Sequence, residues 1–287
     1  MLRRPFAQVK DDQRNLRRLL ETRDGGWARL VERRAGIPLA RIRKTQFIFA
    51  LFILIAALCG CPRQDVDRTI PHEAQDLSDR KIFETLVIGH TVKNRPIECI
   101  IFGQGSPTVL VIGAIHGDEK AGAMLCLELI RFLFQYPDLV VSCRVVIIPI
   151  ANPDGYLQNT RDNANGIDIN RDFRGKPQQA RSASVDFLRS PEPASMAIIS
   201  AIRDFPPSLI LSIHQPLNCI DYDGPSETII HSLSQQWNIP VRKLGSKPGS
   251  LGNYAGEMLG IPTITIELPT EAFFLNRKEL SNTYGYI

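Results

Sequence analysis

The sequence predicts an α/β fold, a mixed, mostly parallel central sheet with helices on both faces, in a single domain over residues 81–287. Apolar, β-rich runs alternate with segments of helical periodicity across this region. Two runs, 108–115 and 144–150, are almost continuously apolar, which is typical of central strands buried on both faces. With 287 residues, 44% of them hydrophobic, the chain is long enough to bury a large core.

Strands and helices are expected in alternation along this domain. The expected strands are 97–102, 108–115, 144–150, 209–214 and 263–268. The expected helices are 119–135, 193–203, 227–237 and 253–259. Pro137 ends the first helix, because proline cannot continue one.

Charge is distributed unevenly along the chain. Residues 1–46 contain 13 Lys and Arg against 5 Asp and Glu, whereas the rest contains 21 against 25. A concentration of basic residues is the main electrostatic sign of nucleic-acid binding, and the domain has none. No nucleic-acid partner is therefore expected.

An export or anchoring signal is expected at residues 47–61. Residues 47–59 are all apolar, basic residues precede them, and Gly60 and Cys61 follow. This run is too short for an ordinary membrane-spanning helix, which needs about 20 residues, and the pattern is that of an export signal. The segment also resembles the processing box of bacterial lipoproteins, in which Cys61 becomes the lipidated mature N-terminus. A simple signal and an uncleaved anchor are the alternatives.

The flanking segments carry further expectations. Residues 1–46 either precede the true start of translation, near Leu39, or form a basic amphipathic helix ahead of a membrane anchor. Residues 62–80 are polar and charged, which predicts a linker. With a working signal the domain is anchored to the membrane of the bacterial cell envelope and faces the periplasm; without one it stays in the cytoplasm.

The domain's cysteines show no metal-binding spacing. Cys99, Cys126, Cys143 and Cys219 occur singly, without a CxxC pair. Export permits disulfides between them, and buried free thiols fit the sequence equally well.

Two of the five histidines, His116 and His214, follow or end predicted buried strands. In open α/β sheets, ligands collect outside the carboxyl ends of the strands. Glu119 follows His116 by three residues, at the start of a predicted helix. A catalytic zinc takes three such ligands and keeps one position open, so these residues form a candidate zinc site. Alone, the HxxE pattern also fits a polar pair at a helix N-terminus.

Other candidate residues follow the later strands. The sequence ANPDG, a predicted turn, comes directly after the strand 144–150, and RDNANGIDINR follows from Arg161 to Arg171. Guanidinium and amide groups together suit a carboxylate ligand, although solvated turns have a similar composition. Glu267 ends an otherwise apolar strand, where a carboxylate is costly unless it is paired or functional.

These motifs occur in the order found in zinc carboxypeptidases. The chain resembles that family in HxxE, NPDG, RxNxxGxDxNR, a strand-end SxH and a strand-end TxE. It resembles the murein-tripeptide amidase branch in DYDGP, PGSLGNYAG and ITIELP, and the likeness runs from about Gly89 to about Thr270. The resemblance implies a hydrolase, a zinc metallocarboxypeptidase or peptide amidase, with one Zn²⁺ per chain.

The resemblance also implies the metal ligands. His116, Glu119 and His214 bind zinc and leave one position for water. Asp168 accepts a hydrogen bond from the outer nitrogen of His116 and thereby orients the ring.

The remaining matched residues act on the substrate. Arg161 polarises the scissile carbonyl, while Asn170 and Arg171 bind the substrate's free carboxylate. Glu267 is the general base, which takes a proton from the zinc-bound water and passes it to the leaving amine.

The chain departs from the digestive carboxypeptidases in two places. No tyrosine aligns with their mobile capping tyrosine, whose place falls within 245–249, and the nearby Tyr254 fits helix packing. Carboxypeptidases that remove basic residues carry a specificity aspartate, and its position in this sequence is occupied around Gly252 and Asn253. The sequence therefore lacks that route to a cationic side chain.

Asp221 and Asp223, in a predicted loop after His214, are expected to bind the amino groups of diaminopimelate instead. The expected reaction is hydrolysis of a C-terminal amide bond in a small peptide with a free carboxylate, with the γ-D-glutamyl-meso-diaminopimelate bond of murein peptides as the leading substrate. An N-acyl-amino-acid deacylase of the aspartoacylase or succinylglutamate desuccinylase type, which resembles IHGDE and DINR, is one alternative. A non-catalytic lipoprotein that binds wall peptides is another.

Overall fold

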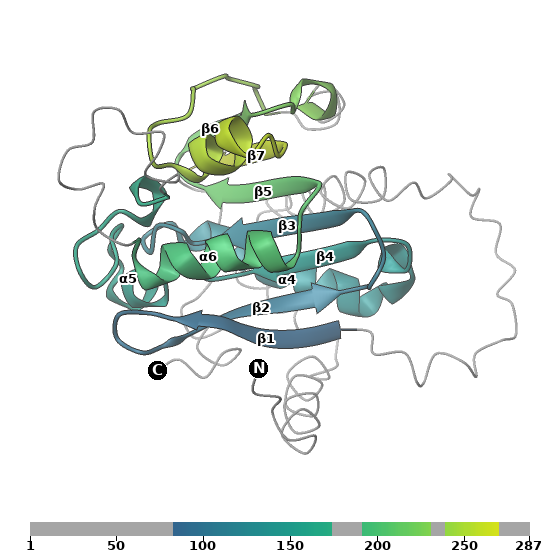
Figure 1. The fold of residues 1–287 in the computed structure, drawn as a ribbon, viewed down its shortest axis with the longest axis horizontal. Helices are drawn as coiled ribbons and strands as arrows, with labels where there is room; N and C mark the ends of the chain where they lie inside the picture. The colour runs from purple at the N-terminus through teal and green to yellow at the C-terminus, as the bar shows by residue number, and fades with distance from the viewer. Residues whose placement is uncertain (1–82, 174–190, 231–238, 270–287) are drawn as a thin grey trace, which may run out of the picture. The chain divides into compact units, whose positions relative to one another are not determined.

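The structure, a computed structural model, describes residues 83–173, 191–230 and 239–269, where seven strands form one mixed sheet (Figure 1). The strands are β1 (Phe83–His90), β2 (Pro96–Phe102), β3 (Thr108–Gly113), β4 (Arg144–Ile148), β5 (Leu209–His214), β6 (Leu217–Asp223) and β7 (Thr263–Pro269). Their order in the sheet is β1-β2-β4-β3-β5-β7-β6. The central strands β4, β3, β5 and β7 are parallel, and the outer strands pair antiparallel. The predicted fold class is confirmed.

The longer helices cover opposite faces of this sheet. The α-helices are α4 (Lys120–Gln135), α5 (Pro153–Gln158) and α6 (Pro193–Asp204), beside the 3₁₀ turns η1 (Pro137–Val140) and η2 (Ile169–Arg171) and the π-helix η5 (Gly252–Met258). In Figure 1, α6 lies in front of the sheet and α4 behind it. Ala197, Ile198 and Ile202 of α6 pack in one apolar cluster with Leu110 and Ile112 of β3. Alternate side chains of this buried strand therefore point toward α6, and those between them point to the opposite face of the sheet.

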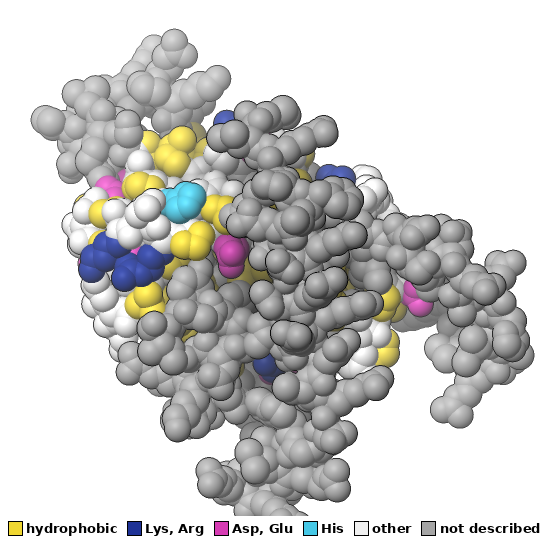
Figure 2. Space-filling model, turned by 90° about the horizontal axis from the view of Figure 1, so that it is seen from below, with side chains coloured by type: hydrophobic (Ala, Val, Ile, Leu, Met, Phe, Trp, Pro, Cys, Tyr) yellow, Lys and Arg dark blue, Asp and Glu magenta, His cyan; other side chains and the backbone are white. Residues whose placement is uncertain are grey.

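The interior strands and two helices lie close to where the sequence predicts them. Two outer strands, β1 and β6, were not expected. Strand β1 is only half-buried at the sheet edge, and β6 carries acidic residues, so both lack the continuous apolar run of an interior strand. Figure 2 views the molecule from the β1 side and shows apolar, basic and acidic side chains interspersed on the described surface.

The segment ANPDG, expected to be a turn, begins helix α5. Asn152 is the N-cap and accepts a hydrogen bond from the Gly155 N–H, while Pro153 occupies the first helical position, where its missing N–H has no cost. Asp154 is fully buried and forms an ion pair with Arg95 of the β1–β2 hairpin turn. Helix α5 is thereby attached to the sheet edge.

Several predictions concern residues that the structure describes in part or not at all. The expected helix 227–237 is helical at 227–230, and its remainder lies outside the described residues. The signal at 47–61 with Cys61, the segment 1–46 and the linker 62–80 also lie outside them. None of the helices in the described ranges is long and apolar enough to cross a membrane.

Three cysteines of the domain are buried free thiols: Cys99, Cys126 and Cys219. Burial raises the pKa of the Cys99 thiol to about 12, so this group stays protonated and packs as a small apolar side chain.

Candidate active site

The parallel strands bring the candidate ligands to one edge of the sheet. His116 lies three residues beyond the end of β3, and His214 is the last residue of the neighbouring strand β5. Glu267 of β7 pairs directly with His214 in the sheet register. Because the strands are parallel, their carboxyl ends coincide, which is the position predicted for the site.

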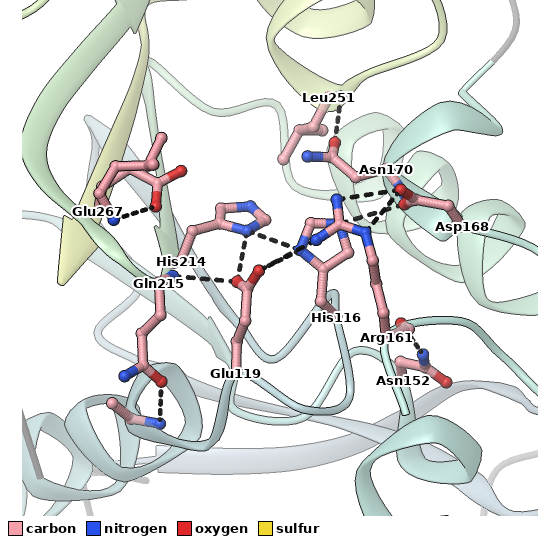
Figure 3. Close-up of polar contacts among 12 residues, drawn as sticks. His116, Glu119, Asn152, Arg161, Asp168, Asn170, His214, Gln215, Leu251 and Glu267 are labelled. Atoms are coloured by element: carbon pink, nitrogen blue, oxygen red, sulfur yellow. Dashed lines mark hydrogen bonds and ion pairs between the residues drawn. The ribbon is translucent and has the colours of Figure 1, made fainter. Parts of the chain in front are cut away.

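The side chains of His116, Glu119 and His214 point toward one another (Figure 3). The Nδ1 atom of His116 is 2.6 Å from Oε1 of Glu119, and the Nδ1 atom of His214 is 2.8 Å from Oε2. The two Nδ1 atoms are 3.1 Å apart. Among the described residues this is the one group of three or more His, Cys, Asp or Glu side chains that could hold a metal ion. All three residues are buried.

Asp168 holds the far side of the His116 ring. Its Oδ1 atom lies 3.1 Å from Nε2 of His116 and also accepts a 2.8 Å hydrogen bond from the Asn170 N–H. With Nε2 donating to Asp168, the lone pair of Nδ1 faces Glu119 and His214. Such a carboxylate is the usual partner of a metal-binding histidine, because it selects the tautomer and orients the ring.

The cluster's electrostatics favour ionised carboxylates. Burial acts to raise the pKa of Glu119, but its contacts with His116 and His214 outweigh burial and lower the pKa to about 2. Burial likewise opposes the charged form of His116, yet the carboxylates of Asp168 and Glu119 raise its pKa above the ordinary value. Two imidazoles and an anionic carboxylate, buried and convergent, are a donor set that fits Zn²⁺.

Arg161 lies beside this cluster with its side chain partly exposed. Its Nε and Nη2 atoms are each 3.1 Å from Oδ2 of Asp168, and Nη1 is 3.5 Å from Oε1 of Glu119. The Arg161 carbonyl accepts hydrogen bonds from the Gly117 N–H at 3.2 Å and from Asn152 Nδ2 at 3.4 Å. The NPDG segment therefore anchors the backbone of Arg161, which the sequence did not indicate.

Asn170 and Arg171 both lie in the turn η2, which follows Asp168. Asn170 Oδ1 accepts a 2.9 Å hydrogen bond from the Leu251 N–H, which fixes the amide with its nitrogen on the side of the cluster (Figure 3). Arg171 is exposed, and its guanidinium donates to the carbonyl of Asn170. Both residues follow Asp168 closely, and Asn170 is the more firmly held; their binding of a substrate carboxylate stays a prediction.

Glu267 is half-buried and does not share the hydrogen bonds of the cluster. Its Oε2 atom accepts a 3.4 Å hydrogen bond from the Leu217 N–H. Burial raises the pKa of Glu267, with the charge of Glu119 adding to the effect and the neighbouring histidines opposing it. A carboxyl whose pKa is raised toward neutrality suits general base chemistry.

Asp221 and Asp223 lie in strand β6, so their placement in a loop is wrong. Their side chains share the sheet face of Glu267, because Cys219 pairs with Glu267 and alternate residues of a strand point the same way. Asp221 pairs with Thr265, and Asp223 with Thr263. The two aspartates are therefore level with positions two and four residues before Glu267 in β7, farther from the sheet edge that carries the cluster.

The carboxylate of Asp223 occupies the space next to Gly252 in the π-helix η5. A Cβ atom added to Gly252 would lie 1.9 Å from Oδ2 of Asp223. Burial and the charges of Asp221 and Glu257 raise the pKa of Asp223 to about 6. Its Oδ1 atom is buried and has no hydrogen-bond partner among the described residues. The carboxylate of Asp223 thus lies beside position 252, where the basic-residue carboxypeptidases carry an aspartate and this sequence has glycine.

Tyr254 packs as the sequence suggested. Its ring stacks on Phe173, with centroids 6.1 Å apart and an interplanar angle of 24°, and burial raises the pKa of its hydroxyl. The residue contacts the main apolar cluster, so it belongs to the core beneath η5.

Gln215, which the sequence did not single out, contacts the cluster. Its N–H donates a 3.1 Å hydrogen bond to Oε2 of Glu119, and its side chain joins the start of α4 to the end of β7. Glutamine has no distinctive spacing or charge, so only the folded arrangement reveals this role.

Comparisons with known proteins agree with this geometry. Murein peptide amidase A of Escherichia coli (strain K12) is 30% identical over 177 residues, which cover 56% of this chain and 70% of that protein. Carboxypeptidase D of Anas platyrhynchos is 31% identical over 134 residues, 41% of this chain but 9% of that much longer protein. The crystal structure of carboxypeptidase A from Helicoverpa armigera has the same fold, with a TM-score of 0.52, 22% identity and coverage of 71% of this chain and 66% of that chain.

The family comparison covers the three candidate metal ligands but ends before Glu267. Residues 73–243, more than half of the chain, match the family described as zinc carboxypeptidase, and this range contains His116, Glu119 and His214. The resemblance seen in the sequence motifs is confirmed. The chain belongs to the zinc carboxypeptidase family.

Proposed function

We propose that this protein is a zinc-dependent carboxypeptidase or amidase that removes the C-terminal residue of a small peptide. The observation that carries the proposal is the buried cluster of His116, Glu119 and His214, with Asp168 behind one ligand. Zinc bound by these three residues supplies Lewis-acid activation of water and of a carbonyl group. Every other group that the hydrolysis needs belongs to the chain itself.

Glu267 acts as the general base in this proposal. It lies near the carboxyl end of β7, the strand that pairs with β5, so it stands next to His214 at the same edge of the sheet. The raised pKa makes its carboxylate a stronger base than an exposed glutamate, and the proton it accepts is passed to the leaving amine. A rate contribution of about 10²–10⁴ is typical for a group in this role.

Arg161 and Asn170 bind and orient the substrate. The guanidinium of Arg161 reaches Glu119 from the solvent side, where it can donate to the oxygen that gains charge as the amide is attacked. Asn170 presents its amide nitrogen, and the exposed Arg171 follows it. Together they provide donors for the terminal carboxylate that defines a carboxypeptidase substrate.

The acidic pair on β6 supports a substrate whose C-terminal side chain carries an amino group. Asp221 and Asp223 share the face of Glu267 and pair with residues two and four positions before it, where we place the side chain of the departing residue. The unpaired Oδ1 of Asp223 is a buried acceptor that an ammonium group would satisfy. Meso-diaminopimelate carries such a group, and the murein peptide amidase of Escherichia coli is a relative.

The deciding experiment is product analysis with zinc-loaded full-length protein. The substrates are L-Ala-γ-D-Glu-meso-diaminopimelate, the same peptide ending in L-Ala, and a panel of N-acyl amino acids, with products identified by mass spectrometry. We expect chelator-sensitive release of diaminopimelate from the first peptide, slowed by about 10²-fold or more in Glu267→Gln. Release of acyl groups alone would show a deacylase, and zinc-dependent binding without turnover would show a wall-peptide-binding protein.

Selectivity tests the acidic pair separately. An Asp221→Asn, Asp223→Asn variant should lose its preference for the diaminopimelate peptide over the alanine peptide while still cleaving both. An unchanged preference would remove Asp221 and Asp223 from substrate recognition.

Export is a separate part of the proposal, and it rests on residues 47–61. We expect a mature N-terminus at a lipidated Cys61 and a protein that fractionates with the cell envelope. Mass spectrometry of the N-terminal peptide tests this, and an intact residue 1 would reject lipoprotein processing.

A further inference from the structure

The first turn of helix α4 is capped from outside the helix. The N–H groups of a helix's first turn lack partners within the helix, and the N-cap side chain commonly accepts from the second or third of them. Glu119 is the N-cap residue of α4 and makes no such bond. Its two carboxylate oxygens are directed to His116 and His214 instead.

Gln215 provides the missing acceptor. Its side-chain oxygen, Oε1, accepts a 3.0 Å hydrogen bond from the N–H of Ala121, the second residue of α4. This is one of the N–H groups that an N-cap side chain would normally take. Figure 3 shows the Gln215 side chain extending from the end of β5 to this helix start.

The same residue also holds the Glu119 carboxylate. The backbone N–H of Gln215 donates to Oε2 of Glu119 at 3.1 Å, on the oxygen that also contacts His214. The N–H of Gln215 therefore holds the Glu119 carboxylate toward the cluster. The Ala121 N–H of α4 already has an acceptor in Gln215 and does not draw the carboxylate back to the helix.

The orientation of the Gln215 amide follows from its two partners. Its Nε2 donates to the carbonyl of Pro269 at 3.3 Å, while Oε1 accepts from Ala121. Turning the amide over would place two donors together at Ala121 and two acceptors together at Pro269. Gln215 thus also connects α4 to the end of β7, two residues beyond Glu267.

We propose that Gln215 is a positioning residue of the metal site: it caps α4 in place of Glu119 and so leaves the Glu119 carboxylate free to bind the metal. The inference rests on the proposed zinc site. Without Gln215, the Ala121 N–H and the two histidines compete for the same carboxylate. A more mobile Glu119 binds the metal less tightly, and partners of this kind commonly contribute 10–100-fold to metal affinity.

Zinc affinity of the full-length protein tests the proposal by competition with a chromophoric chelator. Gln215→Met, which keeps the length but loses both side-chain hydrogen bonds, should weaken zinc binding about tenfold. Gln215→Glu keeps an acceptor for Ala121 but not the donor for Pro269, so it should stay within about threefold of wild type. Gln135→Met, at the exposed far end of the same helix, is the matched control and should bind as wild type does.

The comparison separates capping from a general effect on folding. A residue that only joins β7 to α4 predicts equal losses in both Gln215 variants, and that result would overturn the proposal. Wild-type affinity in Gln215→Met would overturn it too. If that variant does not fold, Gln215→Asn, one methylene too short to reach Ala121, carries the same expectation. A wild-type chain that binds no zinc would instead reject the proposed metal site itself.

Discussion

Asp168 is the residue on which the site's hydrogen bonds converge. One carboxylate accepts from His116, from the Asn170 N–H and from two nitrogens of Arg161. Burial acts against its charge, but the contacts with His116 and Arg161 hold its pKa well below the usual range. One anion therefore orients both His116, a proposed metal ligand, and Arg161, a proposed substrate contact.

Replacement of Asp168 should affect metal and substrate together. Asp168→Asn keeps the shape but removes the charge, so we expect about 10–100-fold weaker zinc binding and a lower kcat/KM even at saturating zinc. Zinc titration followed by kinetics measures both quantities. Asp138→Asn, an exposed change in the turn η1 beyond α4, is the control. Normal zinc affinity with a loss of kcat/KM alone would show that Asp168 serves only Arg161.

The pKa of Glu267 should set the pH at which kcat/KM falls on the acid side. A general base must be ionised, and burial raises the pKa of Glu267, so kcat/KM should fall with decreasing pH at a higher pH than an exposed glutamate, near 4.3, would give. The pH dependence of kcat/KM at saturating zinc measures this limb. Glu267→Gln should lose about 10²-fold or more in kcat while binding zinc normally. An acid limb at the ordinary carboxyl pH would contradict the assignment.

At the scale of elements, the site depends on contacts that strand and helix boundaries do not reveal. The sequence placed Asp221 and Asp223 in a loop because acidic residues are rare in buried strands. In β6 they alternate with Ile220 and Tyr222 and share one face of the strand. Asp223 lies against the π-helix η5, where Gly252 makes room, while Asp221 accepts a hydrogen bond from the Leu244 N–H. A period of two over a short acidic segment is too weak a signal to distinguish from a turn.

The position of Asp223 between β6 and η5 predicts that its carboxylate lowers the stability of the fold while it contributes to the proposed substrate selectivity. The pKa of Asp223 is raised from 3.8 to about 6, so the fold favours the protonated form. That contribution is fully present below pH 3.8 and is lost as the pH rises through 6. Asp223→Asn should therefore be more stable than wild type by about 3 kcal/mol at pH 7.5 and equally stable below pH 3.8.

Urea unfolding at both pH values measures this difference, with Asp138→Asn as an exposed control. The same Asp223→Asn variant should cleave the diaminopimelate peptide less well, as expected where a strained group serves function. A variant that is less stable than wild type at pH 7.5 would show that the Asp223 carboxylate has a stabilising partner.

At the scale of the whole molecule, the strand order assembles the site. His116, His214 and Glu267 lie at the carboxyl ends of three neighbouring parallel strands, β3, β5 and β7. One sheet edge therefore collects residues up to 151 positions apart in the chain. These residues could be predicted, because each stands at the end of an apolar run in a motif with recognisable chemistry. Gln215 could not, because its partner Ala121 lies 94 residues away and neither residue is unusual alone.

Metal binding should therefore stabilise the whole domain. The three ligands come from segments that only folding brings together, so zinc binds the native state in preference to the unfolded chain. Zinc at 100 times its Kd should add about 2.7 kcal/mol and raise the Tm by several degrees. Calorimetry with zinc and with a chelator measures the shift, and His214→Ala should abolish it. An equal shift in that variant would place the zinc elsewhere.

The contact between Asp223 and Gly252 also limits how the acidic group can move during evolution. A side chain at position 252 and a carboxylate at position 223 compete for the same volume, so only one of them can be present. A descendant that transferred the charge from the strand to the π-helix would have to shorten residue 223 first and pass through an uncharged intermediate. The proposed preference for a cationic residue would be lost at that step, so a transfer that keeps the charge requires both positions to change at once.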